Sequence, residues 1–246
     1  CYTWVFSTPM HGLFRCGVGR GKAEAQAILG EQFSGIGVSD DYGAYKYLFN
    51  EHQLCWAHLL RKAIKLMLQH PGERHYRQFL DDLYELYQQA VRWQKDKCLS
   101  VGRAQKVERL KARLSELCSR WQQKVNPETM PIHEQTFIRL QQELMKGINA
   151  LFVFVANPQV EPTNNRSERN LRQEAEVRKG GRTSKTQKGA QRHSVIMSVL
   201  ATLNTRFETF TLDHLLAELS HWSELGLSQF QAELAGMTQA NSLSSA

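Results

Sequence analysis

Apolar and polar positions divide the chain into an amino-terminal part with strand-like patterns and a longer part with helical patterns. Residues 2–7 and 13–18 are rich in aromatic and β-branched side chains, and Pro9 and Gly12 lie between them, which predicts a β-hairpin. The elements predicted next are a helix over 22–29, a buried strand over 35–39, a helix over 42–49 and a short strand over 53–56. These elements indicate a mixed α/β fold for the first part of the chain.

Beyond Trp56 the apolar residues recur every third or fourth position, which is typical of amphipathic helices. Three such series run over 76–93, 107–121 and 138–155. Breaks fall at Pro71-Gly72, Gly102 and Asn126-Pro127. We expect the three stripes to pack together, because each is too short for a sustained coiled coil. Further helices are predicted over 195–203 and 212–225, and the Ser-, Gln- and Asn-rich tail from Met237 is expected to fray.

Composition indicates a folded protein without a membrane span. Hydrophobic residues make up 41% of the chain and charged residues 22%. The longest apolar run, residues 150–156, is far shorter than the roughly 20 residues that cross a bilayer. The five cysteines are odd in number and widely spaced. We therefore expect a reducing cytoplasm rather than a disulfide scaffold.

The formal net charge of +7 is concentrated in one segment. Residues 164–193 contain nine basic and three acidic side chains, which accounts for +6 of that charge. Clustering of this kind indicates a polyanionic partner such as nucleic acid. The alternative is a solvated, basic surface loop.

Two carboxylates lie in positions that suit catalysis. Asp40 directly follows a predicted buried strand, where open α/β sheets place their sites, although a turn or helix cap explains an aspartate there as well. Glu168 lies among arginines of a predicted helix and could hold a divalent cation while the arginines bind phosphates. Alternatively, Glu168 completes a capping box that begins at Asn165.

His52, Cys55 and His58 have the spacing H-x2-C-x2-H, which is similar to half of a zinc site. Zinc takes four ligands, or three and water, and neither Cys98 nor Cys118 comes as a pair. We therefore favour a partly buried cysteine with two ordinary histidines over a zinc site.

Four ordered segments resemble the catalytic domain of the insertion sequence 66 family of transposases. They are residues 38–45 (VSDDYGAY), 53–62 (QLCWAHLLRK), 164–172 (NNRSERNLR) and the pair Arg178-Lys179. The corresponding family patterns are S/T-D-G-Y-x-x-Y, C-W-A-H-x-R-R, N-N-x-x-E-R-x-L-R and R-K. The resemblance extends from the first strand to about Leu219, and it rests on the order of all four segments.

The resemblance implies a ribonuclease-H-like fold with an Asp-Asp-Glu active site that holds two Mg²⁺ (or Mn²⁺) ions. Asp40 would be the second acid, because Asp41 occupies the glycine position of the first pattern, and Glu168 would be the third. Cys55 and His58 match the C-x2-H segment as a structural pair. The implied partner is DNA, both transposon ends and target, bound by a homo-oligomer. The implied DNA-binding residues are Arg166, Arg169, Arg172, Arg178, Lys179 and Arg182.

The family's first acid lies on a strand that precedes the Trp-Val strand, whereas no aspartate precedes Asp40 here. We therefore expect an amino-terminally truncated core that lacks its first strand. The expected divisions are 1–62 and 157–222 for the core, 63–156 for a helical insertion and 223–246 for a tail. The expected function is a transposase catalytic domain, incomplete in this chain. Alternatives are an inactive DNA-binding or regulatory remnant and a helical interaction module.

Overall fold

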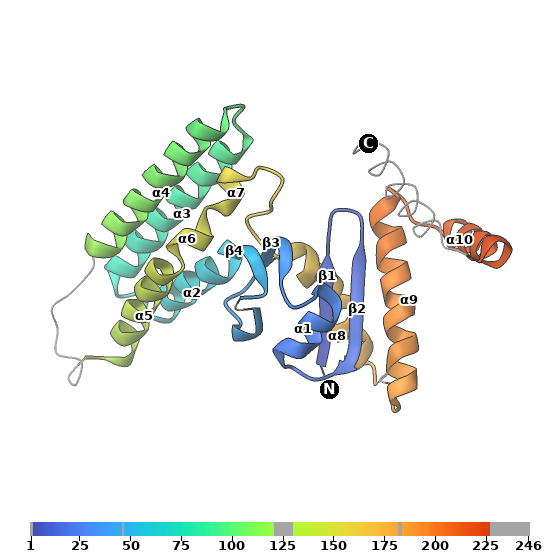
Figure 1. The fold of residues 1–246 in the computed structure, drawn as a ribbon. Coiled ribbons are helices and arrows are strands. Elements are labelled where there is room, and N and C mark those ends of the chain that lie inside the picture. Colours follow the sequence, from blue (N-terminus) through green and yellow to red (C-terminus); the bar gives the residue numbers. More distant parts are fainter. Residues whose placement is uncertain (1, 46, 121–129, 182–183, 227–246) are drawn as a thin grey trace. The chain divides into compact units, whose positions relative to one another are not determined.

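The computed structural model describes residues 2–45, 47–120, 130–181 and 184–226 (Figure 1). The chain forms two compact units, a larger one of Arg20–Arg166 and a smaller one of Cys1–Gly19 with Ser167–Ala246. Each unit combines helices with a two-stranded sheet, so the mixed α/β class is confirmed. Within the described ranges, no helix is long and apolar enough to cross a membrane.

The smaller unit is built on an antiparallel hairpin, as the sequence predicts. Its elements are β1 (Tyr2–Ser7), β2 (Gly12–Val18), most of α8 (Asn165–Lys179), α9 (Gln187–Arg206) and α10 (Leu212–Leu225). The helix α9 is longer at both ends than the predicted range 195–203, whereas α10 has the predicted bounds. Phe14, Met197 and Ala201 form the small apolar core between β2 and α9.

Hydroxyl groups of α9 bind the outer edge of β2, beside which the helix runs (Figure 1). Backbone N–H groups of β2 donate to them from Cys16 to Ser194 (2.9 Å), from Phe14 to Ser198 (2.9 Å) and from Gly12 to Thr202 (3.2 Å). Two strand residues span about 6.7 Å and four helix residues about 6 Å, so the two repeats match over this length. The edge of β2 is therefore satisfied by side chains instead of by another strand.

The larger unit begins with a short α/β segment. Its elements are α1 (Lys22–Leu29), β3 (Phe33–Ser39), the 3₁₀ turn η1 (Gly43–Tyr45) and β4 (Phe49–Leu54). The strands β3 and β4 are parallel, with Ser39 opposite Leu54. The helix predicted over 42–49 is wrong, because Tyr47 has a φ of 61° and the chain then enters β4. The strand predicted over 53–56 accordingly begins earlier, at Phe49.

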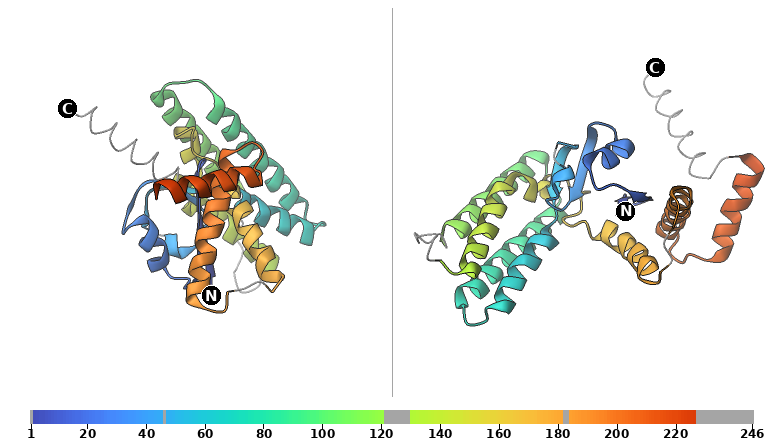
Figure 2. Two further views of the ribbon diagram at one scale, coloured as in Figure 1. Left: turned by 90° about the vertical axis from the view of Figure 1, so that its right-hand side faces the viewer. Right: turned by 90° about the horizontal axis from the view of Figure 1, so that it is seen from below.

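Helices form the rest of the larger unit. They are α2 (Trp56–Gln69), α3 (Arg74–Lys95), α4 (Ser100–Arg120), α5 (Ile132–Lys146), α6 (Ile148–Leu151) and α7 (Val153–Ala156). The helices α2 to α5 lie side by side (Figures 1 and 2). The sequence patterns missed α2, and they merged α5, α6 and α7 into one helix. Gly147 separates α5 from α6 where a Cβ atom would lie 2.5 Å from Leu54 Cδ1, so the chain bends at this close approach.

The predicted apolar stripes pack together into the core of these helices. Buried positions of the stripes include Tyr76, Phe79, Leu83, Leu86, Leu110, Leu114, Leu117, Phe152 and Val155. Trp121 and the break at Asn126-Pro127 lie outside the described residues. The predicted divisions at residues 62, 156 and 222 stay predictions, and the frayed tail also falls outside the described part of the chain.

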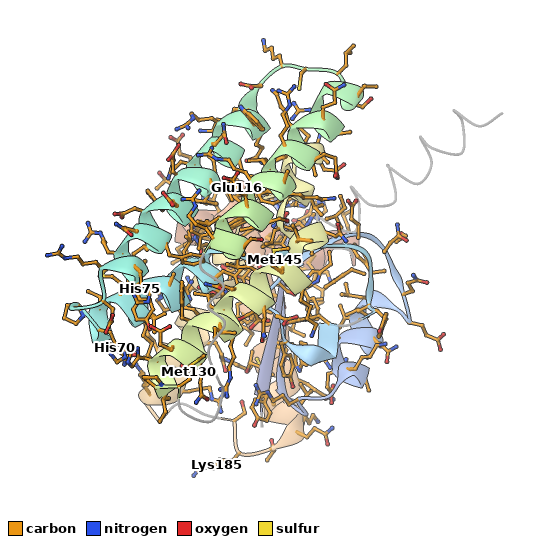
Figure 3. All side chains as sticks on the ribbon, turned by 90° about the vertical axis from the view of Figure 1, so that its left-hand side faces the viewer. His70, His75, Glu116, Met130, Met145 and Lys185 are labelled. Carbon is orange, nitrogen blue, oxygen red and sulfur yellow. The ribbon has the colours of Figure 1, made fainter. Side chains whose placement is uncertain are left out.

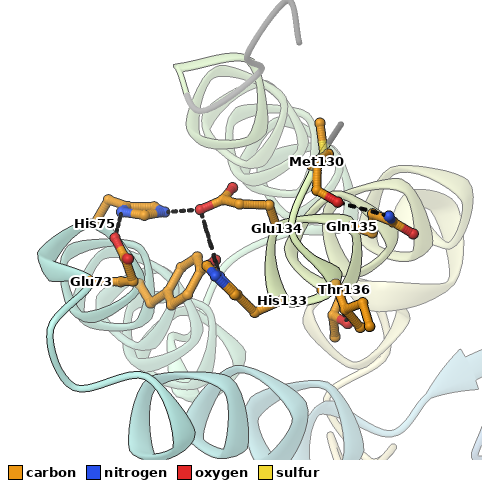
Figure 4. Close-up of polar contacts among 9 residues, drawn as sticks. Glu73, His75, Met130, His133, Glu134, Gln135 and Thr136 are labelled. Carbon is orange, nitrogen blue, oxygen red and sulfur yellow. Dashed lines mark hydrogen bonds and ion pairs between the residues drawn. The ribbon is translucent and has the colours of Figure 1, made fainter. Parts of the chain in front are cut away.

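Polar side chains gather where α2 ends and α3 and α5 begin, near the labelled His70, His75 and Met130 (Figure 3). The Tyr76 hydroxyl is buried; it donates to Glu134 Oε1 (2.8 Å) and lies 2.7 Å from His133 Nδ1. His75 lies between two carboxylates, with Nε2 3.0 Å from Glu134 and Nδ1 3.6 Å from Glu73 (Figure 4). Burial and the bond to Glu134 raise the pKa of Tyr76, so its hydroxyl stays protonated and keeps donating.

We expect Tyr76→Phe to lower the free energy of unfolding by about 1–3 kcal/mol, because the half-buried Glu134 carboxylate loses its hydroxyl donor. Chemical denaturation followed by circular dichroism measures this loss. Tyr84→Phe is the matched control, because Tyr84 lies on the same helix with 51% of its surface exposed. Equal effects of the two substitutions would contradict a stabilising role for the Tyr76–Glu134 bond.

Candidate active site

Asp40 lies just beyond β3, at the end where the parallel strands β3 and β4 both finish. Its Oδ1 accepts a hydrogen bond from the Tyr42 backbone N–H (3.3 Å), which holds the carboxylate in a tight turn. The Ser39 hydroxyl donates to the Asp40 carbonyl (2.8 Å) and lies 2.8 Å from His52 Nε2. Asp40 is half-buried and Asp41 is exposed, so the two neighbouring carboxylates lie in different surroundings.

The aromatic side chains beside Asp40 make its surroundings less polar. Burial, with Asp40 and Tyr42 nearby, raises the pKa of Tyr45 to about 12, so its hydroxyl stays neutral. Burial also lowers the pKa of His52, against the opposing effect of Asp41 and Asp40. Both rings therefore favour their uncharged forms, and the carboxylates of Asp40 and Asp41 both lie at this end of the sheet.

Cys55 joins the segments that carry the predicted site. Its backbone N–H donates to the Ser39 carbonyl (2.8 Å), directly before Asp40. Its buried Sγ accepts from the Asn164 N–H (3.4 Å), at the start of the third segment that resembles the transposases. The next residue, Trp56, donates its N–H to the Pro162 carbonyl (3.1 Å). The first two segments and Asn164, the first residue of the third, thus meet within the larger unit.

Glu168 lies in the first turn of α8 and is half-buried. It belongs to the smaller unit, whereas Asp40 belongs to the larger one, so the convergence of Asp40 and Glu168 stays a prediction. Arg166, two residues earlier, forms an ion pair with Glu161. A carboxylate that is already present therefore offsets the charge of Arg166, the first of the predicted DNA-binding residues.

The other predicted DNA-binding residues lie in or after α8. Arg169, Arg172, Arg178 and Lys179 are exposed, and Arg182 lies outside the described residues. Glu174 is the buried residue of α8 and faces the hairpin and α9. At 100° per residue, Arg169 and Arg172 lie about 140° and 160° around the helix from Glu174, so they point away from the packed face.

One group of reactive side chains was missed by the sequence patterns. Cys16 from β2, Glu174 from α8 and His193 from α9 place one ligand atom each within 4.8 Å of the others. Sequence inspection counted Glu174 merely as a charge opposing the basic segment and Cys16 as an unpaired cysteine. No spacing links three residues so far apart in the chain, so the sequence held no signal for this group.

Comparison with protein families supplies the identity that the geometry alone leaves open. The family model described as "Transposase IS66 family" matches residues 1–192, which include all four segments and both predicted acids. Comparisons with curated proteins and with solved structures gave no match. Since the match covers well over half of the sequence, the chain belongs to the IS66 family of transposases.

Proposed function

We propose that the chain forms part of the catalytic domain of a DDE-type transposase, which cleaves and joins DNA with Mg²⁺ or Mn²⁺ on a ribonuclease-H-like core. Membership in a transposase family implies DNA as a partner. Asp40 and Glu168 would hold the metal, because carboxylate oxygens are the ligands that these hard cations prefer. The half-buried Asp40 carboxylate fits this role, since the Tyr42 N–H fixes its orientation without neutralising its charge.

The meeting at Cys55 of segments that match the family patterns carries this proposal. Asp40 follows the residue whose carbonyl binds the Cys55 N–H, and Asn164 donates to the Cys55 thiol. Glu168 is four residues after Asn164, so covalent geometry keeps the two Cα atoms within about 15 Å of each other. Each acid thus lies one to four residues along the chain from a residue that is hydrogen-bonded to the buried Cys55.

The residues around the acids would position DNA for phosphoryl transfer. Bound divalent ions activate the attacking oxygen and stabilise the leaving oxygen in such reactions. Asp40 and Glu168 would place those ions, and the exposed Arg169 and Arg172 would bind the phosphates of the strand. The neutral ring of His52 would add no positive charge beside Asp40. The reaction is tested by DNA strand transfer that depends on both carboxylates.

We expect DNA binding to be salt-sensitive and to depend on α8. With about five phosphate contacts, log K should fall against log salt with a slope near −4 to −5, and Arg169→Ala with Arg172→Ala should flatten it by about two. Titrations at several salt concentrations measure the slope. The control removes the same charge from the exposed Arg74 and Arg109 of the larger unit. An unchanged slope in the α8 variant would place the DNA-binding surface elsewhere.

A further inference from the structure

The smaller unit contains a buried group of a thiol, a carboxylate and an imidazole. Cys16 is 7% exposed and Glu174 5% exposed. His193 Nε2 lies 2.7 Å from Glu174 Oε2, and the Thr3 hydroxyl donates to Glu174 Oε1 (3.3 Å). These residues come from β1, β2, α8 and α9, so the group joins every element around the hairpin.

The contacts of α8 with the hairpin and with α9 depend on this group. Glu174 is the one buried residue of α8, and the helix places no fully buried apolar side chain against its neighbours. Its other contact with the hairpin is polar, from Asn170 Nδ2 to the Ser7 hydroxyl (3.0 Å). Burying a carboxylate in place of an apolar side chain costs free energy unless strong partners compensate it. The helix that carries a proposed catalytic acid is thus attached through a buried carboxylate and further polar contacts, without a fully buried apolar side chain.

The three donors match the ligand preference of zinc. Thiolate, imidazole and carboxylate are the groups that bind Zn²⁺, with water or a hydroxyl in the fourth position. The side chain of His193 is 25% exposed, which leaves a route for a metal to enter. In a tetrahedral site, Nε2 of His193 and Oε2 of Glu174 would separate from 2.7 Å to about 3.3 Å. This change is within the range of small side-chain rotations.

The other mixed group of the described residues is a weaker candidate. Glu73, His75 and Glu134 also lie close together, but the side chain of Glu73 is 46% exposed. The two ring nitrogens of His75 already face the two carboxylates, and no thiol is present (Figure 4). These contacts are complete as an ion-pair network without a metal.

We propose that Cys16, Glu174 and His193 bind one Zn²⁺ ion, which fixes α8 to the hairpin and to α9. This site is separate from the proposed Asp40 and Glu168 site and takes a softer metal. Its effect is mechanical: it would hold the helix that carries Glu168 and the arginines in one position.

Cobalt substitution tests the ligands directly. We expect the full-length chain to bind one Co²⁺ with a thiolate-to-metal charge-transfer band, which Zn²⁺ abolishes by displacement. Cys16→Ala should remove the band, and His193→Asn should weaken zinc affinity by at least about 100-fold. Cys98→Ala is the control, because Cys98 lies in the larger unit and should leave the band unchanged. A folded wild-type chain without a thiolate band would overturn the proposal.

Two further measurements separate this site from the others. The double variant Asp40→Asn with Glu168→Gln should keep the cobalt band, even if the same variant loses transposition. Zinc should slow amide hydrogen exchange in α8 of the wild-type chain and leave it unchanged in His193→Asn. Equal protection of α8 with and without zinc would show that the Glu174–His193 pair is a metal-free contact, and would contradict the proposal.

Discussion

Replacing Asp40 by Asn should lower transposition of a marked element by a factor of about 10³ or more. The amide oxygen of Asn can still accept the Tyr42 N–H, so the turn after β3 should survive. What the substitution removes is the charge of the proposed metal ligand, and a lost stabilisation of several kcal/mol corresponds to roughly three orders of magnitude in rate. Asp41→Asn is the matched control, because Asp41 is the exposed neighbour, and it should stay within about threefold of the wild type by the scale of surface substitutions.

Glu168→Gln should cause a loss as large as that of Asp40→Asn, and Glu176→Gln on the same helix is its control. Because the proposed mechanism uses both acids as one metal-binding unit, the double variant should be little worse than either single one. Transposition frequency in cells gives the measurement, and melting temperatures confirm that the variants fold. Equal losses for Asp40→Asn and Asp41→Asn, or for Glu168→Gln and Glu176→Gln, would refute the assignment of the two acids.

The largest expected effect on stability follows from Trp56→Ala, at about 3–5 kcal/mol. Trp56 is fully buried at the start of α2, and its ring packs against Tyr87 and Phe152. Its Nε1 donates to the Leu151 carbonyl (2.6 Å), which also accepts from Gln53 Nε2 (3.1 Å), so alanine leaves a cavity and removes one of two donors to a buried acceptor. Urea unfolding followed by circular dichroism measures the loss.

Trp222→Ala controls for the chemical change, because Trp222 is 57% exposed in α10 and its loss should cost less than about 0.5 kcal/mol. Trp56→Phe should fall between the two, since phenylalanine keeps most of the ring packing and loses the hydrogen bond. A loss below about 1 kcal/mol for Trp56→Ala would mean that the core around α2 rearranges to fill the cavity.

The elements that sequence patterns predicted well are those whose side chains alternate or repeat clearly. The hairpin and α10 have regular patterns, and the structure has them at or close to the predicted positions. The segment 42–49 failed because its aromatic residues resemble a helical stripe, whereas Tyr47 adopts a left-handed conformation that ends any helix. The helix α2 was hidden because strand-like and helical patterns overlap at its start, near Trp56.

The candidate site was predictable only in part, for a physical reason. Asp40 and Glu168 belong to short patterns that can be identified in one dimension. The role of Cys55 was not predictable, because its bonds to Ser39 and Asn164 depend on how strands and loops meet in space. The proximity of Cys16 and His193 was not predictable either, because these residues lie far apart in the sequence and come together only in the fold.

The row of hydroxyl groups that joins α9 to β2, from Ser194, Ser198 and Thr202, also limits which insertions the protein can accept during evolution. One residue inserted between Ser194 and Thr202 would turn the later hydroxyls by about 100°, and one inserted between Gly12 and Cys16 would flip the strand face. Length variation is thus confined to the ends of both elements. These hydroxyl groups also occupy the outer edge of β2. A further strand of this sheet can therefore pair only along β1.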